Sequence, residues 1–235
     1  MKVHAALPLL SKALIYVVLA AVLTFSAVSI VAVQAASGIS LRSNTTANNG
    51  AGSTGLTIAK PAGVVAGDVM VAQVVVNSST VIITAPSGWM LIRNTAASSA
   101  MVMASYYKAA TSSEPSSYRW TFSATQPATG GISDYIGVKT SSPIDSSSGK
   151  VNGSTATASF TQVTTHGAND MLLAFVGLAG NTTVMPPAGF VESYDRSDTS
   201  SGSGRSAELS HAVKSTAGAT SVGSAKEGTL AVTNI

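Results

Sequence analysis

Cysteine is absent from the 235 residues of this sequence. Its absence excludes disulfide bonds and thiolate metal sites. A folded domain of this chain must therefore be held by its hydrophobic core and by hydrogen bonds between strands. That is feasible for one domain of roughly 200 residues, because the buried fraction of the surface rises with chain length.

Charged residues are also scarce, at 10% of the chain against about 25% in an average soluble protein. Ser, Thr, Asn and Gly supply the polarity instead, a composition typical of exported all-β surface proteins. The formal net charge is +3, and two of the basic residues, Lys2 and Lys12, precede an apolar run near the N-terminus. The remaining basic residues are scattered singly and form no stripe that matches a phosphate backbone, so we expect no nucleic-acid partner.

The N-terminus carries the strongest single signal. The run ALIYVVLAAVLTFSAVSIVAV (residues 13–33) contains no charge, and V-Q-A then has the spacing of a signal-peptidase site after Ala35. This run is longer than the ~7–15 apolar residues of an ordinary signal peptide, and roughly 20 suffice to span a bilayer. Residues 1–35 are therefore interpreted as a leader helix, either a cleaved signal peptide or an uncleaved membrane anchor. In both cases the remaining chain is predicted to be secreted or displayed on the cell surface.

The rest of the chain is predicted to be all-β. Short apolar runs such as VMVAQVVV (69–76) are separated by turn residues, and no stretch has an apolar stripe with helical period. In SYRWTF (117–122) aromatic and polar residues alternate, as in a half-buried strand. The predicted fold is a two-sheet antiparallel β-sandwich, jelly-roll-like, over residues 61–235.

Residues 36–60 are polar and rich in Gly and Asn, and we interpret them as a flexible N-terminal arm. The arm contains two short β-prone pieces, ISLR and LTIA. Such a piece either forms an ordinary edge strand or pairs with a neighbouring copy of the chain. Copies of the chain are thus one candidate partner.

An internal duplication is the clearest pattern after the leader. GDVMVAQVVV and NDMLLAFVGL start similarly, and P-S-G-W and P-A-G-F follow them at matching distances. We predict two related halves, residues 61–145 and 156–235, because neither half can bury both faces of its sheet alone. The paired landmarks are Asp68 with Asp170, Pro86 with Pro187, Gly88 with Gly189, Trp89 with Phe190, and Lys108 with Lys214.

Four stretches, GDVMVAQVVV, APSGWMLI, ASYYKAATSSEPSSYRWTFS and GGISDYIGVKTSSPID, resemble an exported module of large bacterial surface proteins. In that module a GDV-type strand, a PxGW turn, a YYK/SEP segment and a closing PID recur. The resemblance covers most of residues 60–235. It implies a β-sandwich that serves as an extracellular building or adhesion unit, and it brings no catalytic residues.

Candidate sites are few. Trp120, Tyr106 and Tyr135 are the aromatic residues that could stack on a sugar ring, whereas Trp89 is expected to be a buried plug because its duplicate is also aromatic. The repeated Asp68 and Asp170 are expected to cap turns rather than to bind calcium. We predict no catalytic residues, no metal and no cofactor.

These observations predict a non-enzymatic extracellular protein, either an adhesion protein or a filament-forming subunit. A carbohydrate-binding module is the first alternative and would need exposed aromatic residues on one flat face. A secreted glycan hydrolase is the second alternative and would need two carboxylates about 5–10 Å apart in a cleft.

Overall fold

The computed structural model describes residues 26–33, 35–97, 100–153, 157–198, 204–221 and 223–227. In these ranges every regular element is a β-strand, and the paired strands run antiparallel. The predicted all-β, antiparallel sandwich class is therefore confirmed. No helix long and apolar enough to cross a membrane occurs in this part of the chain.

The strands are β1 (Ser26–Val33), β2 (Ala35–Asn48), β3 (Ser53–Ala59), β4 (Val69–Val76), β5 (Ile83–Thr84), β6 (Met90–Ala97), β7 (Met101–Ala109), β8 (Ser117–Gln126), β9 (Ala128–Val138), β10 (Ile144–Asn152), β11 (Thr157–Ser159), β12 (Thr164–Thr165), β13 (Asp170–Leu178), β14 (Val184–Met185), β15 (Val191–Ser197), β16 (Ser206–Lys214), β17 (Gly218–Ala219) and β18 (Ser224–Glu227).

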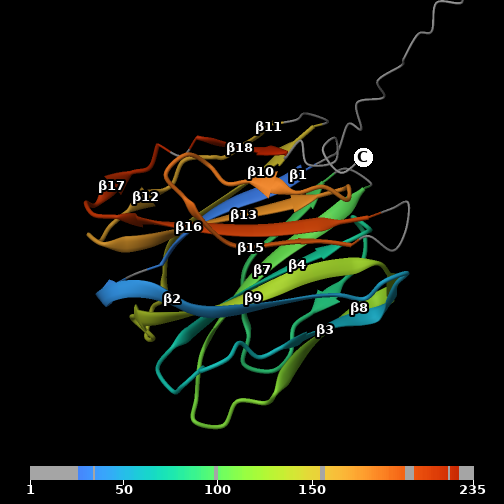
Figure 1. Cartoon of the computed structure of the whole chain (residues 1–235), viewed down its shortest axis with the longest axis horizontal. Coiled ribbons are helices and arrows are strands. Elements are labelled where there is room, and N and C mark those ends of the chain that lie inside the picture. The colour runs from blue at the N-terminus through green and yellow to red at the C-terminus, as the bar shows by residue number, and fades with distance from the viewer. Residues whose placement is uncertain are drawn as a thin grey trace, which may run out of the picture.

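The strands build two β-sandwiches that are stacked on each other (Figure 1). The first sandwich has a large sheet of order β2-β9-β4-β7-β6 and a small sheet of order β3-β8-β5. The second sandwich has a large sheet of order β10-β1-β13-β16-β15 and small sheets β11-β18-β14 and β12-β17. The two large sheets face each other, and the small sheets lie on the outside.

The sequence of β4 shows why the stack has more layers than the single two-sheet sandwich expected over residues 61–235. All eight of its residues are buried. Met70, Ala72 and Val74 face the small sheet of the first sandwich, whereas Val71 and Val75 face the second sandwich. A strand that is apolar on both faces must be covered on both faces. Each large sheet therefore needs two partner layers.

The shared core between the large sheets is the largest apolar cluster that the structure describes. It takes side chains from both sandwiches: Ala27, Val31, Val33, Ile39, Val69, Val71, Val75, Ala97, Met101, Met103, Tyr135, Val138, Met171, Leu173, Phe175, Tyr194, Ala207 and Leu209. Gln73 adds a buried polar contact across it, since its Nε2 donates to the carbonyl of Val176 at 2.9 Å. The two sandwiches are thus packed as one body.

The large sheets have the same strand order once β1 is equated with β9, β10 with β2, β13 with β4, β16 with β7 and β15 with β6. The register agrees with this equivalence. Tyr135 of β9 lies opposite Val69, and Val33 of β1 lies opposite Met171, so both members of the pair differ by 102 residues. The structural repeats are therefore residues 26–127 and 128–227, and not the predicted halves 61–145 and 156–235, because β1 and β9 open the two repeats.

The first strand of each repeat lies in the sheet of the other repeat. Strand β1 opens the first repeat but lies between β10 and β13 of the second sandwich. Strand β9 opens the second repeat but lies between β2 and β4 of the first sandwich. In Figure 1 the blue β1 accordingly runs among the orange and red strands of the second repeat. The two repeats are interlocked by a reciprocal strand exchange.

Irregularities of the strands repeat as well. The β2 ladder skips Arg42 where the β10 ladder skips Asp145. The β6 ladder skips Ile92 where the β15 ladder skips Ser193. Bulges at equivalent positions in both repeats are specific backbone features, so they support the duplication independently of the sequence landmarks.

Most of the sequence landmarks occupy equivalent places. Gly88 and Gly189 have φ angles of 82° and 84°, a conformation that favours glycine. Both turns are closed by the same backbone hydrogen bond. The N–H of Trp89 donates to the carbonyl of Pro86, and the N–H of Phe190 donates to the carbonyl of Pro187. The lysines are the exception. Lys108 lies opposite Met70, whereas Lys214 lies opposite Asp170, so the residue equivalent to Lys108 is Ala212.

The N-terminal boundaries need correction. Residues 26–33 were assigned to a leader that ends at residue 35, but the structure places them in the middle of a sheet with all eight residues buried. A charge-free β-branched run suits a buried strand as well as a leader. Residues 1–25 lie outside the described residues. The predicted flexible arm, residues 36–60, instead forms the edge strand β2 and the strand β3 within the first sandwich.

Trp89 packs as the plug of the first sandwich. Its exposed fraction is 7%, and its ring lies 5.1 Å from that of Tyr118 and 5.2 Å from that of Trp120 in edge-to-face contacts. Such pairs stabilise a core beyond their buried area. The equivalent Phe190 is only partly buried.

We predict that Trp89→Ala lowers the free energy of unfolding by about 3–5 kcal/mol, because it leaves a cavity among packed rings. Urea denaturation followed by circular dichroism measures the loss. Phe190→Ala is the matched control in the second sandwich and should be clearly less destabilising. Equal losses for the two variants would contradict the assignment of Trp89 as the better packed plug.

Candidate functional site

The predicted sugar-stacking platform is not formed. Trp120 is 0% exposed, Tyr106 is 3% exposed and Tyr135 is 1% exposed. Trp120 and Tyr106 point into the core of the first sandwich, and Tyr135 points into the shared core. In β8 the aromatic residues alternate with polar ones, and the aromatic side chains are the buried ones, so this alternation reflects packing and not ligand stacking.

Asp68 caps the turn before β4 and also binds an arginine. Its Oδ2 accepts the backbone N–H of Val65 at 2.9 Å, and its Oδ1 lies 3.1 Å from Nη2 of Arg42. Arg42 also reaches the buried Asp134, with Nε 3.2 Å from Oδ2. Burial and, to a smaller extent, the neighbouring Asp68 raise the pKa of Asp134, Arg42 opposes both, and the result is a pKa of about 7. The cluster is a local ion-pair network that fixes the bulge of β2.

Lys108 closes the loop between β7 and β8. Its Nζ lies 2.9 Å from Oε1 of Glu114, while the hydroxyl of Tyr118 donates to Oε2 at 2.6 Å. Burial by itself would raise the pKa of Glu114, but hydrogen bonds from Tyr118, Thr111 and Lys108 lower it to about 2. The Y-Y-K and S-E-P segments of the sequence thus meet in one structural network.

A groove of about 490 Å³ lies where β2 of the first sandwich meets β13, β15 and β16 of the second. Its walls are mostly apolar, with Ile39, Leu41, Met171, Val191 and Val213 among the lining residues. Val191 and Val213 are exposed large hydrophobic side chains, at 64% and 58%. Grooves at the junction of two packed units are common binding sites.

One hydrogen-bonded chain of side chains borders this groove. Oγ of Ser193 lies 2.8 Å from Nδ1 of His211, and the hydroxyl of Tyr135 lies 3.3 Å from the same Oγ. Ser193 is the bulge residue of β15, and Nδ2 of Asn44 holds its carbonyl at 2.7 Å. Burial lowers the pKa of His211, which favours the neutral ring.

A hydroxyl beside a neutral imidazole is the first half of a nucleophile–base arrangement. In serine hydrolases a carboxylate orients the imidazole through its other nitrogen. Within the described ranges, only Nδ1 of His211 has a hydrogen-bond partner. The contact between Ser193 and His211 could not be predicted from their spacing in the sequence, because it depends on the bulge at Ser193 in β15.

A second titratable pair lies on the other face of the second large sheet. Asp195 of β15 and Glu208 of β16 are directly opposite each other. Burial raises the pKa of Asp195, the hydrogen bond from the N–H of Val184 opposes this, Glu192 adds to it, and the result is a pKa of about 6. Burial likewise raises the pKa of the fully buried Glu208 well above its ordinary value. Glu208 occupies a packed interior position rather than a cleft.

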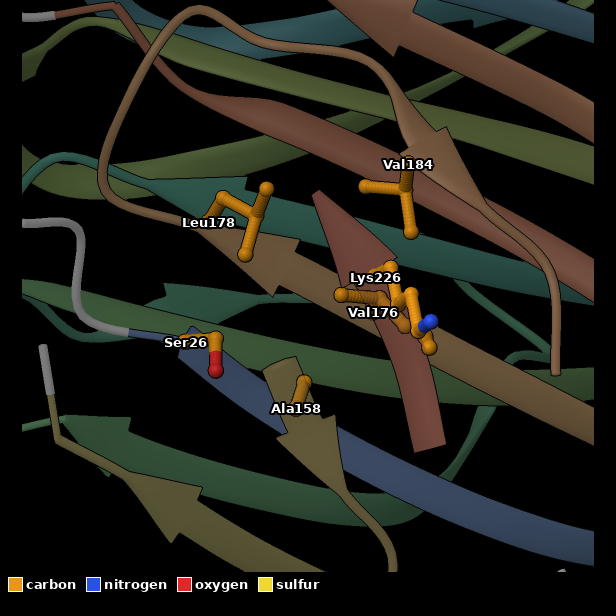
Figure 2. Close-up of a pocket in the computed structure, with 7 residues that line it drawn as sticks. Ser26, Ala158, Val176, Leu178, Val184 and Lys226 are labelled. Carbon is orange, nitrogen blue, oxygen red and sulfur yellow. The ribbon is translucent and has the colours of Figure 1, made fainter. Parts of the chain in front are cut away.

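A narrow, mostly apolar gap lies between the large and small sheets of the second sandwich, without room for a water molecule. Figure 2 shows Ala158, Val176, Leu178 and Val184 around it. The residues paired at this position explain why the gap is present in the second sandwich and not in the first. Ala158 lies opposite Ala225, whereas the equivalent residues of the first sandwich are Leu56 and Trp120. The space results from smaller side chains and is not a ligand pocket.

Comparisons with known proteins give no functional assignment, so the proposal below is based on the sequence and on the geometry of the structure. A scan against protein-family models and searches among curated proteins and solved structures find no match to the chain. In the part of the chain that the structure describes, no three His, Cys, Asp or Glu residues are grouped to hold a metal ion.

A second prediction concerns pH. A carboxyl whose pKa is raised on folding binds its proton more tightly in the native state, so stability falls as pH rises from the unfolded pKa to the folded one. Glu208→Gln imitates the protonated form. The variant should exceed the wild type in free energy of unfolding at pH 8, and the difference should shrink toward pH 4.

Denaturation at a series of pH values tests this expectation. Asp195→Asn should behave similarly, but its difference from the wild type should level off near pH 6, because the pKa of Asp195 is raised only to about 6. A Glu208→Gln difference that stays constant from pH 4 to pH 8 would refute the burial effect.

Proposed function

We propose that this chain is a non-enzymatic structural or adhesion protein of the cell surface, built as an interlocked pair of β-sandwiches. The observation that supports this best is the reciprocal exchange of β1 and β9 between the repeats. Each sandwich contains a strand of the other repeat, so the two cannot separate without opening a large sheet.

This arrangement resists pulling. Strand β1 is bonded along its length to β10 and β13, and both neighbours run antiparallel to it. A force along β1 must shear both ladders together, because β1 is an interior strand with a hydrogen-bonded neighbour on each side. Forced unfolding is governed by the unfolding rate, and a sheared double ladder makes that rate slow. Mechanical strength suits an extracellular building unit.

The composition agrees with display outside the cell. The chain has no cysteine and few charges, and Ser and Thr dominate its polar residues. The apolar N-terminal run preceding β1 provides the export signal in this proposal. The carbohydrate-binding alternative loses its main support, because Trp120 and Tyr106 are buried in the first sandwich.

The absence of native cysteine allows a direct test of display. Ser112→Cys places one thiol in the exposed loop between β7 and β8. Intact producing cells are treated with a membrane-impermeant maleimide, and the protein is then isolated. We expect labelling of Ser112→Cys without lysis.

Val75→Cys is the matched control, since Val75 is 0% exposed and should react only after denaturation. A cytosolic thiol protein reports on lysis. If Ser112→Cys is labelled only in lysed cells, the chain is not displayed and the proposed function fails.

A further inference from the structure

The position between β10 and β13 in the second large sheet is a slot for one strand, and β1 fills it. Eight residues of β1 pair with eight of β13, and no residue of β1 is more than 2% exposed. Val28 packs toward the small sheet, and Val31 packs into the shared core. Whatever fills this slot must be an uncharged strand that is apolar on both faces.

The equivalent slot of the first sandwich is filled differently. Its strand β9 is joined to the described structure at both ends, by one residue to β8 and by residues 139–143 to β10. Strand β1 is joined to a neighbouring strand only through residue 34, which leads into β2. Residues 1–25, which precede β1, lie outside the described residues. Withdrawing β1 from its slot therefore displaces one connection to a described strand, the one through residue 34. Withdrawing β9 displaces two, the connections to β8 and to β10.

The exchange already present within the chain shows that the slot accepts a strand from outside its own repeat. The β1 ladder matches the β9 ladder in register, including the bulge opposite Arg42 in β2 and opposite Asp145 in β10. Nothing in these backbone ladders depends on which copy of the chain supplies the strand. Main-chain hydrogen bonds and alternate buried side chains would be the same.

We propose that the slot between β10 and β13 is a strand-acceptor site that also takes β1 from a second copy of this chain. This inference deepens the proposed surface function, on which it rests, by naming the partner. One copy then gives β1 at one end and receives β1 at its own slot. Such a contact joins two different surfaces, so it is heterologous and continues from copy to copy as a filament.

The shared core sets the geometry of this assembly. Because only residue 34 separates β1 from β2, the accepting sheet must lie against the first sandwich of the donating copy, as it does within one chain. Residues 139–143 between β9 and β10 are the segment that must extend when the accepting sandwich belongs to another copy. Lys139 and Thr140 are exposed, so this segment is accessible for that change.

Single cysteines in the full chain test the proposal. Val31 of β1 lies opposite Ser147 of β10. Residues directly opposite on antiparallel strands have Cα atoms about 4.5–5.5 Å apart, which a disulfide can bridge. Val31→Cys and Ser147→Cys are placed in separate copies with tags of different size. The two proteins are co-expressed or refolded together and then oxidised.

We expect a disulfide-linked species that carries both tags, with a yield that rises with protein concentration. The matched control is the equivalent pair in the first sandwich, Ser133→Cys of β9 and Asn44→Cys of β2, which are also directly opposite. That pair should give no mixed species, because β9 is tied at both ends. The doubly substituted Val31→Cys/Ser147→Cys chain, oxidised at low concentration, shows whether the disulfide forms when β1 occupies its own slot.

Three outcomes would overturn the proposal. The first is internal closure of the double variant with no mixed species at any concentration. The second is an equal yield from the control pair. The third is an exported protein whose N-terminal sequence begins after Ala35, because β1 would then be missing from every copy. Each of these is independent of the maleimide test, which reports display of the chain and not its assembly.

Discussion

The two backbone ladders of β1 carry the constraint on which the other features depend. They attach the edge strand β10 to the rest of its sheet, since β10 has no other neighbour in that sheet. They also bring Ala27, Val31 and Val33 into the shared core, which packs one large sheet against the other. Removing β1 would leave two rows of buried backbone groups without partners, and such groups are costly to bury. The second sandwich therefore cannot close without a strand in this position.

The two sandwiches share their strand order but differ in their core side chains, and the differences described next all weaken the core of the second sandwich. In the first sandwich Trp89 and Trp120 fill the space between sheets, whereas Ala225 stands at the position of Trp120 in the second. The second sandwich also buries Glu208 where the first has Ala104, which places a carboxyl in an apolar layer. A smaller core and a buried carboxyl both lower stability. From these two differences we expect the second sandwich to be the less stable of the two and to open at a lower cost in free energy than the first.

Local patterns predicted part of this structure. The alternation around Trp120 identified a half-buried strand, and the repeated Pro-x-Gly turns identified the duplication, because both signals depend on neighbours in sequence. The sequence could not separate stacking aromatics from packed ones, since exposure depends on which face a distant sheet covers. The Ser193–His211 pair was also beyond reach. It requires a bulge in one strand and the register of the next, and neither has a signature in the residues themselves.

The length of the N-terminal apolar run is explained by the fact that its last eight residues form strand β1. The uncharged stretch 13–33 was too long for an ordinary signal peptide and long enough for a membrane span. Because Ser26–Val33 belongs to the sheet, residues 13–25 remain, a length typical of a signal-peptide core and short of the roughly 20 residues a span requires. Within the proposed export, this favours processing before Ser26. The V-Q-A match at residue 35 then lies at the join of β1 and β2, and cleavage there would remove the strand that the second sandwich needs.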